Sequence, residues 1–297
     1  MRMSSVMEGY MRRRLSVSLL ISLKVVSSLA AAEETNFEPY LGQEPPGTTA
    51  EVFAPGIVSI PGRYEYALSV SPDGKEIVFS TEMPGESSKL MMTRHRQGGW
   101  TDPILLQLTQ GARKGEMEAF FTPDGGSLFL AVYDEGMDVR IWSSDREGEG
   151  WSLARQLESP VNGAAVFYPT FSPSRTLYFT NIEERQIYRS RLENDSYPRI
   201  EAVNVGGFHA FVAPDDSYLL SDANGDIQVS FRDDSGAWSE PRPLGKEVNT
   251  PDSETCPSVS PDGRYLFFSR YPGPEKISDI FWVDSAVIAR AGPERAE

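Results

Sequence analysis

Ser71-Pro72-Asp73-Gly74 is a stretch that returns along the chain, in whole or in part, and it decides the fold. The later copies are Thr122-Pro123-Asp124-Gly125, Ser172-Pro173-Ser174-Arg175, Ala213-Pro214-Asp215-Asp216 and Ser260-Pro261-Asp262-Gly263. Their first residues are separated by 51, 50, 41 and 47 positions. A period of this length is typical of propeller blades and too long for a leucine-rich or ankyrin repeat. The sequence therefore predicts an all-β protein of stacked four-stranded units.

Each copy has the same layout on both sides of this turn. An extended segment precedes the turn, and a strand with a period-two apolar pattern follows it, as in Ile77-Val78-Phe79 and Leu266-Phe267-Phe268. In the turn, proline sets φ, aspartate bonds the local backbone and glycine accepts a positive φ. A third apolar strand comes next, and in three copies a tryptophan (Trp100, Trp151 or Trp238) begins a fourth. Each unit therefore resembles one antiparallel blade.

The fifth copy has no tryptophan-led fourth strand before the chain ends. Upstream of the first copy, the segment from Val52 to Val58 has the proline placement and the apolar interval of a fourth strand. An N-terminal strand that completes the last blade would close the ring and remove an unpaired sheet edge. We therefore expect a five-bladed β-propeller at 51–285, a linker or strap at 33–50 and a C-terminal tail at 286–297. Six blades are the alternative.

The first 32 residues differ from the rest. Arg12-Arg13-Arg14 precedes a mostly apolar run from Leu15 to Leu29, and Ala30-Ala31-Ala32 supplies the small residues of a cleavage site. This pattern predicts a secretory signal peptide at 1–32 and a periplasmic or secreted protein. An uncleaved anchor and a disordered cytoplasmic tail are the alternatives. No later stretch approaches the roughly 18 apolar residues of a spanning helix, so we expect a soluble mature chain without a membrane span, and a monomer.

Charge and cysteine content exclude several classes of function. The formal net charge of −15 argues against a nucleic-acid partner, because phosphate binding needs clustered Lys and Arg. Cys256 is the single cysteine, which rules out an intramolecular disulfide and a cysteine-rich zinc site.

The repeat motifs resemble those of a known family. The Ser-Pro-Asp-Gly turn, the Asp279-Ile280-Phe281-Trp282 strand and the Trp238-Ser239-Glu240-Pro241 strand are similar to the PD40, or WD40-like, repeats of TolB-type propellers. The resemblance covers about residues 51–284 and implies the propeller fold. Such propellers occur as periplasmic binding proteins, as gating domains of peptidases and as secreted proteins, so the fold does not select a function. No Gly-x-Ser-x-Gly nucleophile motif is present, which argues against a peptidase.

Candidate site residues lie in the segments before the turns. Glu65, Glu116 and Glu254 each lie six residues before their turn, so we expect their carboxylates at equal height near one channel mouth. Two residues further along their own copies lie Glu118, Tyr168, His209 and Cys256. A binding site made of Glu65, Glu116, Glu118, Tyr168, His209 and Glu254 could hold a basic or sugar ligand, or a cation through hard oxygen ligands.

Two other interpretations of these glutamates stay open. Each one could instead accept a hydrogen bond from the backbone of a neighbouring blade, since residues that maintain the fold repeat with it. Glu116 and Glu254 could also be the catalytic pair of a glycoside hydrolase or lyase, whose two carboxylates stand on different strands.

The sequence favours an exported binding or scaffold module for a protein, peptide or saccharide. A secreted carbohydrate-active enzyme is the alternative, and a purely structural module within an envelope complex is a third interpretation. We expect no cofactor, and Ca²⁺ is the metal ion that these carboxylates would suit.

Overall fold

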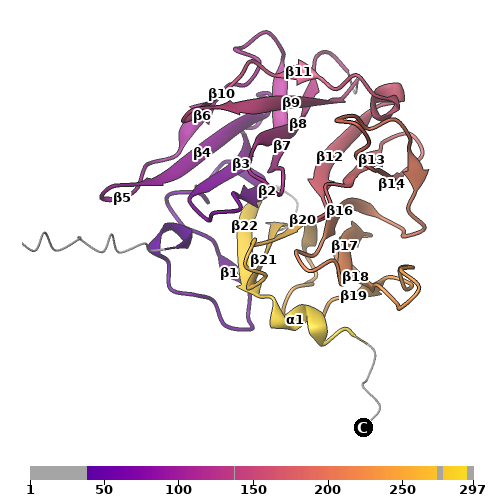
Figure 1. Ribbon diagram of the computed structural model, residues 1–297. Coiled ribbons are helices and arrows are strands. Elements are labelled where there is room, and N and C mark those ends of the chain that lie inside the picture. Colours follow the sequence, from indigo (N-terminus) through magenta and orange to yellow (C-terminus); the bar gives the residue numbers. More distant parts are fainter. Residues whose placement is uncertain (1–38, 137, 273–276, 293–297) are drawn as a thin grey trace, which may run out of the picture. The chain divides into compact units, whose positions relative to one another are not determined.

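The computed structural model describes residues 39–136, 138–272 and 277–292, and these form a five-bladed β-propeller. Five small antiparallel sheets follow one another in chain order around a common centre (Figure 1). The predicted all-β fold and the number of blades are therefore confirmed. The expected signal peptide at 1–32 lies outside the described residues.

In each blade a long innermost strand is followed by two further strands and by short outer strands. The first blade contains β2 (Tyr64–Val70), β3 (Glu76–Glu82), β4 (Lys89–Arg96), β5 (Gly99–Trp100) and β6 (Ile104–Leu106). The second contains β7 (Gly115–Phe121), β8 (Ser127–Tyr133), β9 (Arg140–Glu147), β10 (Gly150–Trp151) and β11 (Arg155–Gln156). The third contains β12 (Val166–Phe171), β13 (Leu177–Asn181), β14 (Gln186–Ser190) and β15 (Glu201–Ala202).

The remaining two blades follow the same plan. The fourth contains β16 (Phe208–Val212), β17 (Tyr218–Ala223), β18 (Asp226–Phe231) and β19 (Arg242–Pro243). The fifth contains β20 (Ser253–Val259), β21 (Tyr265–Tyr271), β22 (Asp279–Asp284) and, from the N-terminal side, β1 (Glu51–Val52). Short helices are η1 (Tyr40–Gly42), η2 (Pro160–Gly163) and α1 (Ala286–Ala289). No helix among the described residues is long and apolar enough to cross a bilayer.

The ring closes as the sequence predicted, through an N-terminal strand. β1 pairs antiparallel with β22, with Glu51 opposite Trp282 and Val52 opposite Phe281. The backbone N–H of Phe53 adds a hydrogen bond of 2.8 Å to the carbonyl of Ile280. The outer edge of the last blade is therefore covered by a segment more than 200 residues away in the sequence, which is the closure that a propeller requires.

The closing strand is shorter than the segment from Val52 to Val58 that the sequence indicated. Ala54 takes a positive φ of 42°, and the chain turns back there instead of continuing along β22. Phe53 and Val58, on the two sides of this turn, are both fully buried. The two apolar residues that suggested one continuous strand therefore lie at the end of a strand and in the loop after it. Both pack in the cluster around Trp282.

The Pro-Asp-Gly turns keep one geometry even where glycine is absent. In the first turn Asp73 accepts hydrogen bonds from the hydroxyl of Ser71 and the N–H of Lys75, and Gly74 has a φ of 72°. Arg175 and Asp216 occupy the glycine position of the third and fourth turns with a φ of 62°. This conformation costs a residue with a Cβ about 1–2 kcal/mol, so the hairpin tolerates local strain there.

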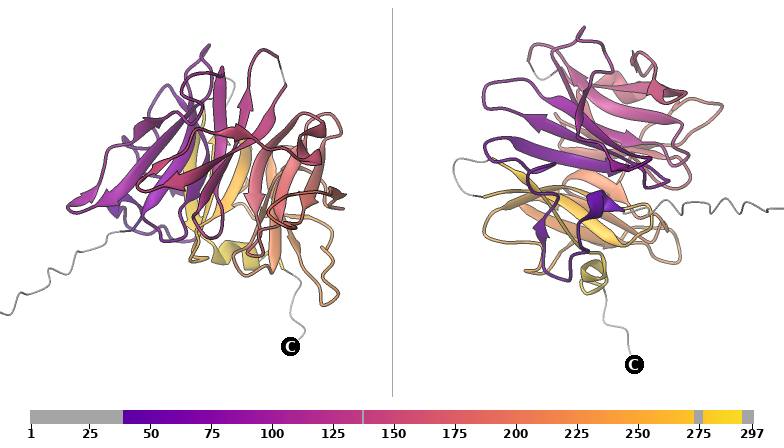
Figure 2. Two further views of the ribbon diagram at one scale, coloured as in Figure 1. Left: turned by 45° about the horizontal axis from the view of Figure 1, so that its top comes forward. Right: turned by 90° about the vertical axis from the view of Figure 1, so that its left-hand side faces the viewer.

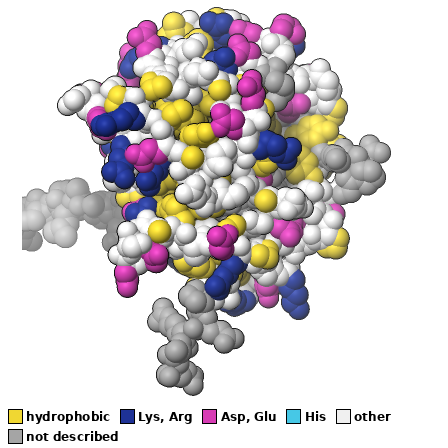
Figure 3. Space-filling model, turned by 90° about the vertical axis from the view of Figure 1, so that its right-hand side faces the viewer, with side chains coloured by type: hydrophobic (Ala, Val, Ile, Leu, Met, Phe, Trp, Pro, Cys, Tyr) yellow, Lys and Arg dark blue, Asp and Glu magenta, His cyan; other side chains and the backbone are white. Residues whose placement is uncertain are grey.

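Segments outside the repeats pack on the last blade. The ring of Tyr40 contacts the rings of Tyr265 and Trp282 at centroid distances of 5.0 and 5.9 Å. In α1, Val287 and Ile288 are buried against the same blade and the fourth one. In the right-hand view of Figure 2, η1, β1 and α1 lie near the yellow strands of the last blade. On the side shown in Figure 3, basic, acidic and apolar side chains are interspersed.

Candidate functional site in the central channel

Each innermost strand contains one β-bulge at the same place. The register of the ladder shifts once in β2, β7, β12, β16 and β20. At each shift one residue adopts a φ between 50° and 56°; we call these the bulge residues, and they are Ala67, Glu118, Tyr168, His209 and Cys256. Because a bulge re-aims its side chain, residues from different blades meet in the channel. Glu118, Tyr168 and His209, predicted from the sequence to share one level, are thus brought together.

The N–H groups of three bulge residues are bound by side chains of the preceding blade. Ser80 accepts from Glu118 at 2.7 Å, Thr180 accepts from His209 at 3.3 Å, and Asp222 accepts from Cys256 at 3.1 Å. Ser80, Thr180 and Asp222 hold equivalent positions on β3, β13 and β17, each opposite the residue before the bulge. In the first, third and fourth blades, one position on the second strand therefore supports the bulge of the next blade.

The second blade departs from this scheme, and the departure positions Glu118. Its equivalent residue is Ala131, opposite Met117, and an alanine side chain cannot accept a hydrogen bond. The N–H of Tyr168 instead donates to Oε2 of Glu118 at 2.8 Å. The carboxylate of Glu118 is therefore held across the junction between the second and third blades.

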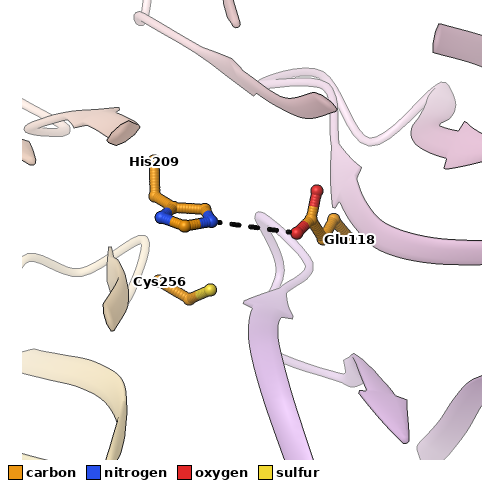
Figure 4. Close-up of side chains that lie close together, drawn as sticks. All are labelled: Glu118, His209 and Cys256. Carbon is orange, nitrogen blue, oxygen red and sulfur yellow. Dashed lines mark ion pairs between the residues drawn. The ribbon is translucent and has the colours of Figure 1, made fainter. Parts of the chain in front are cut away.

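A polar cluster forms around His209 (Figure 4). Nδ1 of His209 lies 2.6 Å from Oδ2 of Asp222, which also accepts hydrogen bonds from the hydroxyl of Thr255 and the N–H of Cys256. On the other side of the ring, Nε2 lies 3.9 Å from Oε1 of Glu118. Ligand atoms of Glu118, His209 and Cys256 all lie within 4.8 Å of one another. The cluster thus joins nitrogen, oxygen and sulfur donors from three blades.

Burial and neighbouring charge set the protonation of this cluster. Burial lowers the pKa of His209, but the carboxylate of Asp222 and the neighbouring Cys256 outweigh it and hold that pKa well above 6.5. Burial raises the pKa of Glu118 to about 7, against the opposing effects of His209 and the N–H of Tyr168. Burial also raises the pKa of the Cys256 thiol. At neutral pH the cluster therefore retains protons, with a charged imidazolium at its centre.

Aromatic rings pack against the cluster. The rings of Phe167 and Tyr168 meet His209 edge to face at 5.0 and 4.7 Å. Tyr168 donates from its hydroxyl to the carbonyl of Pro257, and its ring contacts Phe120 at 4.9 Å. His209 keeps 15% of its side-chain surface exposed, whereas Glu118 keeps 5%.

The three repeated glutamates have a different environment. Their carboxylates accept hydrogen bonds from the segments that precede their own blades: Glu65 from Ile60 and Arg63, Glu116 from Leu108 and Thr109, and Glu254 from Thr250. Glu254 is also paired with Arg270 at 2.7 Å. All three are buried. These hydrogen bonds are the kind that the fold-maintaining interpretation expects.

A cavity lies at the opposite end of the channel, where the Pro-Asp-Gly turns meet. We call it the turn-end cavity. Its volume is about 420 Å³, and its lining includes one proline from each blade: Pro72, Pro123, Pro173, Pro214 and Pro261. Phe120 and Phe211 line it on the channel side. Phe120 therefore stands between this cavity and the polar cluster.

Asp222 and Thr255 are the cluster members that the sequence reasoning missed. Asp222 lies on the second strand of its blade. Ser80 and Thr180, which carry hydroxyl groups, occupy the same register position in two other blades. A carboxylate in this position breaks the repeat, and aligning the second strands would have shown it. Thr255 lies next to Cys256, but nothing in its sequence context marks it.

Comparison with known proteins supports the fold and shows no family. No protein-family model matches the chain, and no curated protein matches it. Among solved structures, the GH43_1 enzyme from Xanthomonas citri in complex with xylose is similar, with a TM-score of 0.53 and 12% identity over 76% of this chain and 88% of that one.

Two further solved structures have lower TM-scores. TolB from Acinetobacter baumannii gives 0.45 at 16% identity, over 73% of this chain and 54% of that one. A gluconolactonase from Xanthomonas campestris gives 0.48 at 11% identity, over 84% and 98%. At 12% identity, the likeness to the Xanthomonas citri enzyme concerns the propeller fold alone.

Proposed function

We propose that this propeller is a noncovalent binding module that holds an apolar side chain of a protein or peptide partner in the turn-end cavity. The observation that carries the proposal is the cavity itself, which combines a volume of about 420 Å³ with a lining of five prolines and several phenylalanines. Small-molecule and side-chain sites are typically concave, mostly apolar and in this range of volume. Because each blade contributes to the lining, the site exists only in the closed ring.

The polar groups of the cavity favour an apolar side chain over a saccharide. Ser69, Thr122 and Ser258 contribute the hydroxyls in the lining, and each of them forms a hydrogen bond within the protein. A sugar would bury several hydroxyl groups there, and each one without a partner would cost about 1–3 kcal/mol. An apolar side chain brings no such cost.

The alternative function as a glycoside hydrolase or lyase receives less support from the candidate pair. Glu116 and Glu254 would have to reach a substrate, but both are buried and accept hydrogen bonds from the protein itself. Neither carboxylate lines the turn-end cavity. We therefore prefer binding without catalysis. Export through residues 1–32 and a periplasmic or secreted location belong to the same proposal and can be tested by cell fractionation.

The proposal is tested with N-acetyl-phenylalaninamide and with xylose as probes, titrated into the protein by calorimetry. We expect the amide to bind and xylose to give no heat. Phe211→Leu should weaken amide binding about two- to tenfold, because an aromatic contact contributes about 0.5–1.5 kcal/mol. The matched control is Phe281→Leu, which alters a half-buried phenylalanine outside the cavity. Equal effects of the two substitutions, or preferred binding of xylose, would contradict the proposal.

A further inference from the structure

The polar cluster around His209, which includes Glu118 and Cys256, has no part in the proposed function. Along the innermost strands it lies two residues before the level of Phe120, which lines the turn-end cavity from the channel side. The three side chains come from β7, β16 and β20, so only the closed ring assembles them. Their positions are set by bulges at one shared level.

The spacing of the three side chains is close to that of a metal site. Zn²⁺ binds Cys, His and carboxylate ligands at about 2.0–2.3 Å, which puts neighbouring ligand atoms of a tetrahedral site roughly 3.3–3.8 Å apart. Nε2 of His209 and Oε1 of Glu118 are already 3.9 Å apart, and no pair of ligand atoms in the cluster exceeds 4.8 Å. Small side-chain rotations would therefore be sufficient to bring all three onto one ion.

Asp222 fixes the histidine in the orientation that such a site needs. It binds Nδ1 of His209 at 2.6 Å, which directs Nε2 towards Glu118 (Figure 4). A carboxylate on the second ring nitrogen is the usual partner of a metal-bound histidine, since it sets the tautomer and the ring orientation. Asp222 is itself held by Thr255 and by the N–H of Cys256.

The charges of the cluster also suit a cation. Two carboxylates and a thiol surround one imidazole in a largely buried volume. A divalent ion would bind these groups as a neutral histidine, a thiolate and a carboxylate, and its positive charge would offset theirs.

We propose that Glu118, His209 and Cys256 form a binding site for a divalent transition-metal ion of the Zn²⁺ class, with Asp222 as the positioning residue. Three protein ligands leave a fourth position for water or for a ligand group that enters the channel beside His209, which is the partly exposed member. The sulfur and nitrogen ligands favour Zn²⁺ over the Ca²⁺ that carboxylates alone would suggest.

Cobalt substitution tests this site directly. The tag-free full chain, stripped of metal with a chelator, is titrated with Co²⁺ and then with Zn²⁺. We expect a thiolate-to-cobalt charge-transfer band and the visible bands of tetrahedral Co²⁺, all removed by Zn²⁺. Cys256→Ser should abolish the charge-transfer band, and Asp222→Asn should weaken Zn²⁺ binding about 10- to 100-fold in a competition titration with a chromophoric chelator.

The matched control is His95→Gln, which removes the other histidine of the chain and should leave both spectra and affinity unchanged. Denaturant unfolding without metal checks the fold of each variant, and Cys256→Ala replaces Cys256→Ser if the latter does not fold. Absence of the charge-transfer band in the wild-type chain, or Zn²⁺ affinity unchanged in Cys256→Ser, would overturn the proposal. So would rapid alkylation of Cys256 by iodoacetamide that Zn²⁺ does not slow. Binding of N-acetyl-phenylalaninamide is independent of all these outcomes.

Discussion

Two levels of the innermost strands, two residues apart, differ in what they repeat. Glu65, Glu116 and Glu254 repeat the same side chain, and each accepts hydrogen bonds from the segment that leads into its blade. The bulge residues repeat a backbone conformation but carry five different side chains. The glutamate is thus repeated because the same backbone N–H groups must be bound at several blade junctions. At the bulge level only the backbone conformation is repeated, so the side chains are available to form a site. The experiments below test this distinction.

The largest expected effect on stability comes from the level of the repeated glutamates. Glu254→Gln removes the charge that pairs with Arg270, whose side chain is only 12% exposed. Breaking a buried ion pair by removing one partner costs about 3–5 kcal/mol, because the remaining charge stays buried. We expect a loss of this size in the free energy of unfolding, measured with denaturant.

The matched control for that substitution is Glu201→Gln. Glu201 forms an ion pair with Arg189, but its side chain is half exposed. Exposed pairs contribute about 0–1 kcal/mol, so this variant should unfold almost as the wild type does. If both substitutions had the same small effect, the structural role that we assign to the repeated glutamates would be wrong.

An intermediate effect is expected in the pH dependence of stability, through the bulge residues Glu118 and His209. The pKa of Glu118 is raised to about 7, and the pKa of His209 is held well above 6.5. Both groups bind protons more strongly in the folded chain, so stability falls as pH rises. The contribution of His209 is complete below about pH 6.5 and is lost as pH rises through its folded pKa, while ionisation of Glu118 destabilises the fold increasingly from about pH 4.5 to 7.

Thermal unfolding of the metal-free protein between about pH 5 and 8 measures this dependence. We expect the midpoint to fall with rising pH, and Glu118→Gln should flatten the curve because its side chain does not titrate. Burial also raises the pKa of Glu65 to about 7. This group contributes the same pH dependence to the wild type and to Glu118→Gln, so its contribution cancels when the two curves are compared. Superimposable curves would contradict the protonation state that we assign to the cluster.

The smallest expected effect comes from restoring the repeat in the second blade. Ala131→Ser would supply the hydroxyl that Ser80 and Thr180 provide elsewhere, and the N–H of Tyr168 could then donate to it instead of Glu118. One hydrogen bond replaces another, so the free energy of unfolding should change by no more than about 1 kcal/mol. The pKa of Glu118, followed by NMR titration, should rise because its carboxylate loses a donor. An unchanged pKa would mean that Glu118 is not held in the way we describe.

The site was harder to predict from the sequence than the fold, because it depends on where single side chains point at the β-bulges. Counting back from each turn placed Glu118, Tyr168 and His209 at one level, and the structure brings them together. The same counting placed Glu65, Glu116 and Glu254 at a second level, but it could not show that their carboxylates bind the preceding segments. Without the bulges, period-two alternation would leave the two levels pointing the same way.

The sequence by itself predicted five blades, with six as the alternative, and an N-terminal closing strand, because turn chemistry and strand periodicity are local and repeat five times. It also set the chemical identity of the residues at each bulge. Only the tertiary structure decided that Glu118, His209 and Cys256 face one another and that Asp222 joins them, since these residues come from different blades. The physical reason is closure: a ring brings residues far apart in the chain to a shared axis, and a bulge in each innermost strand turns one side chain per blade towards it.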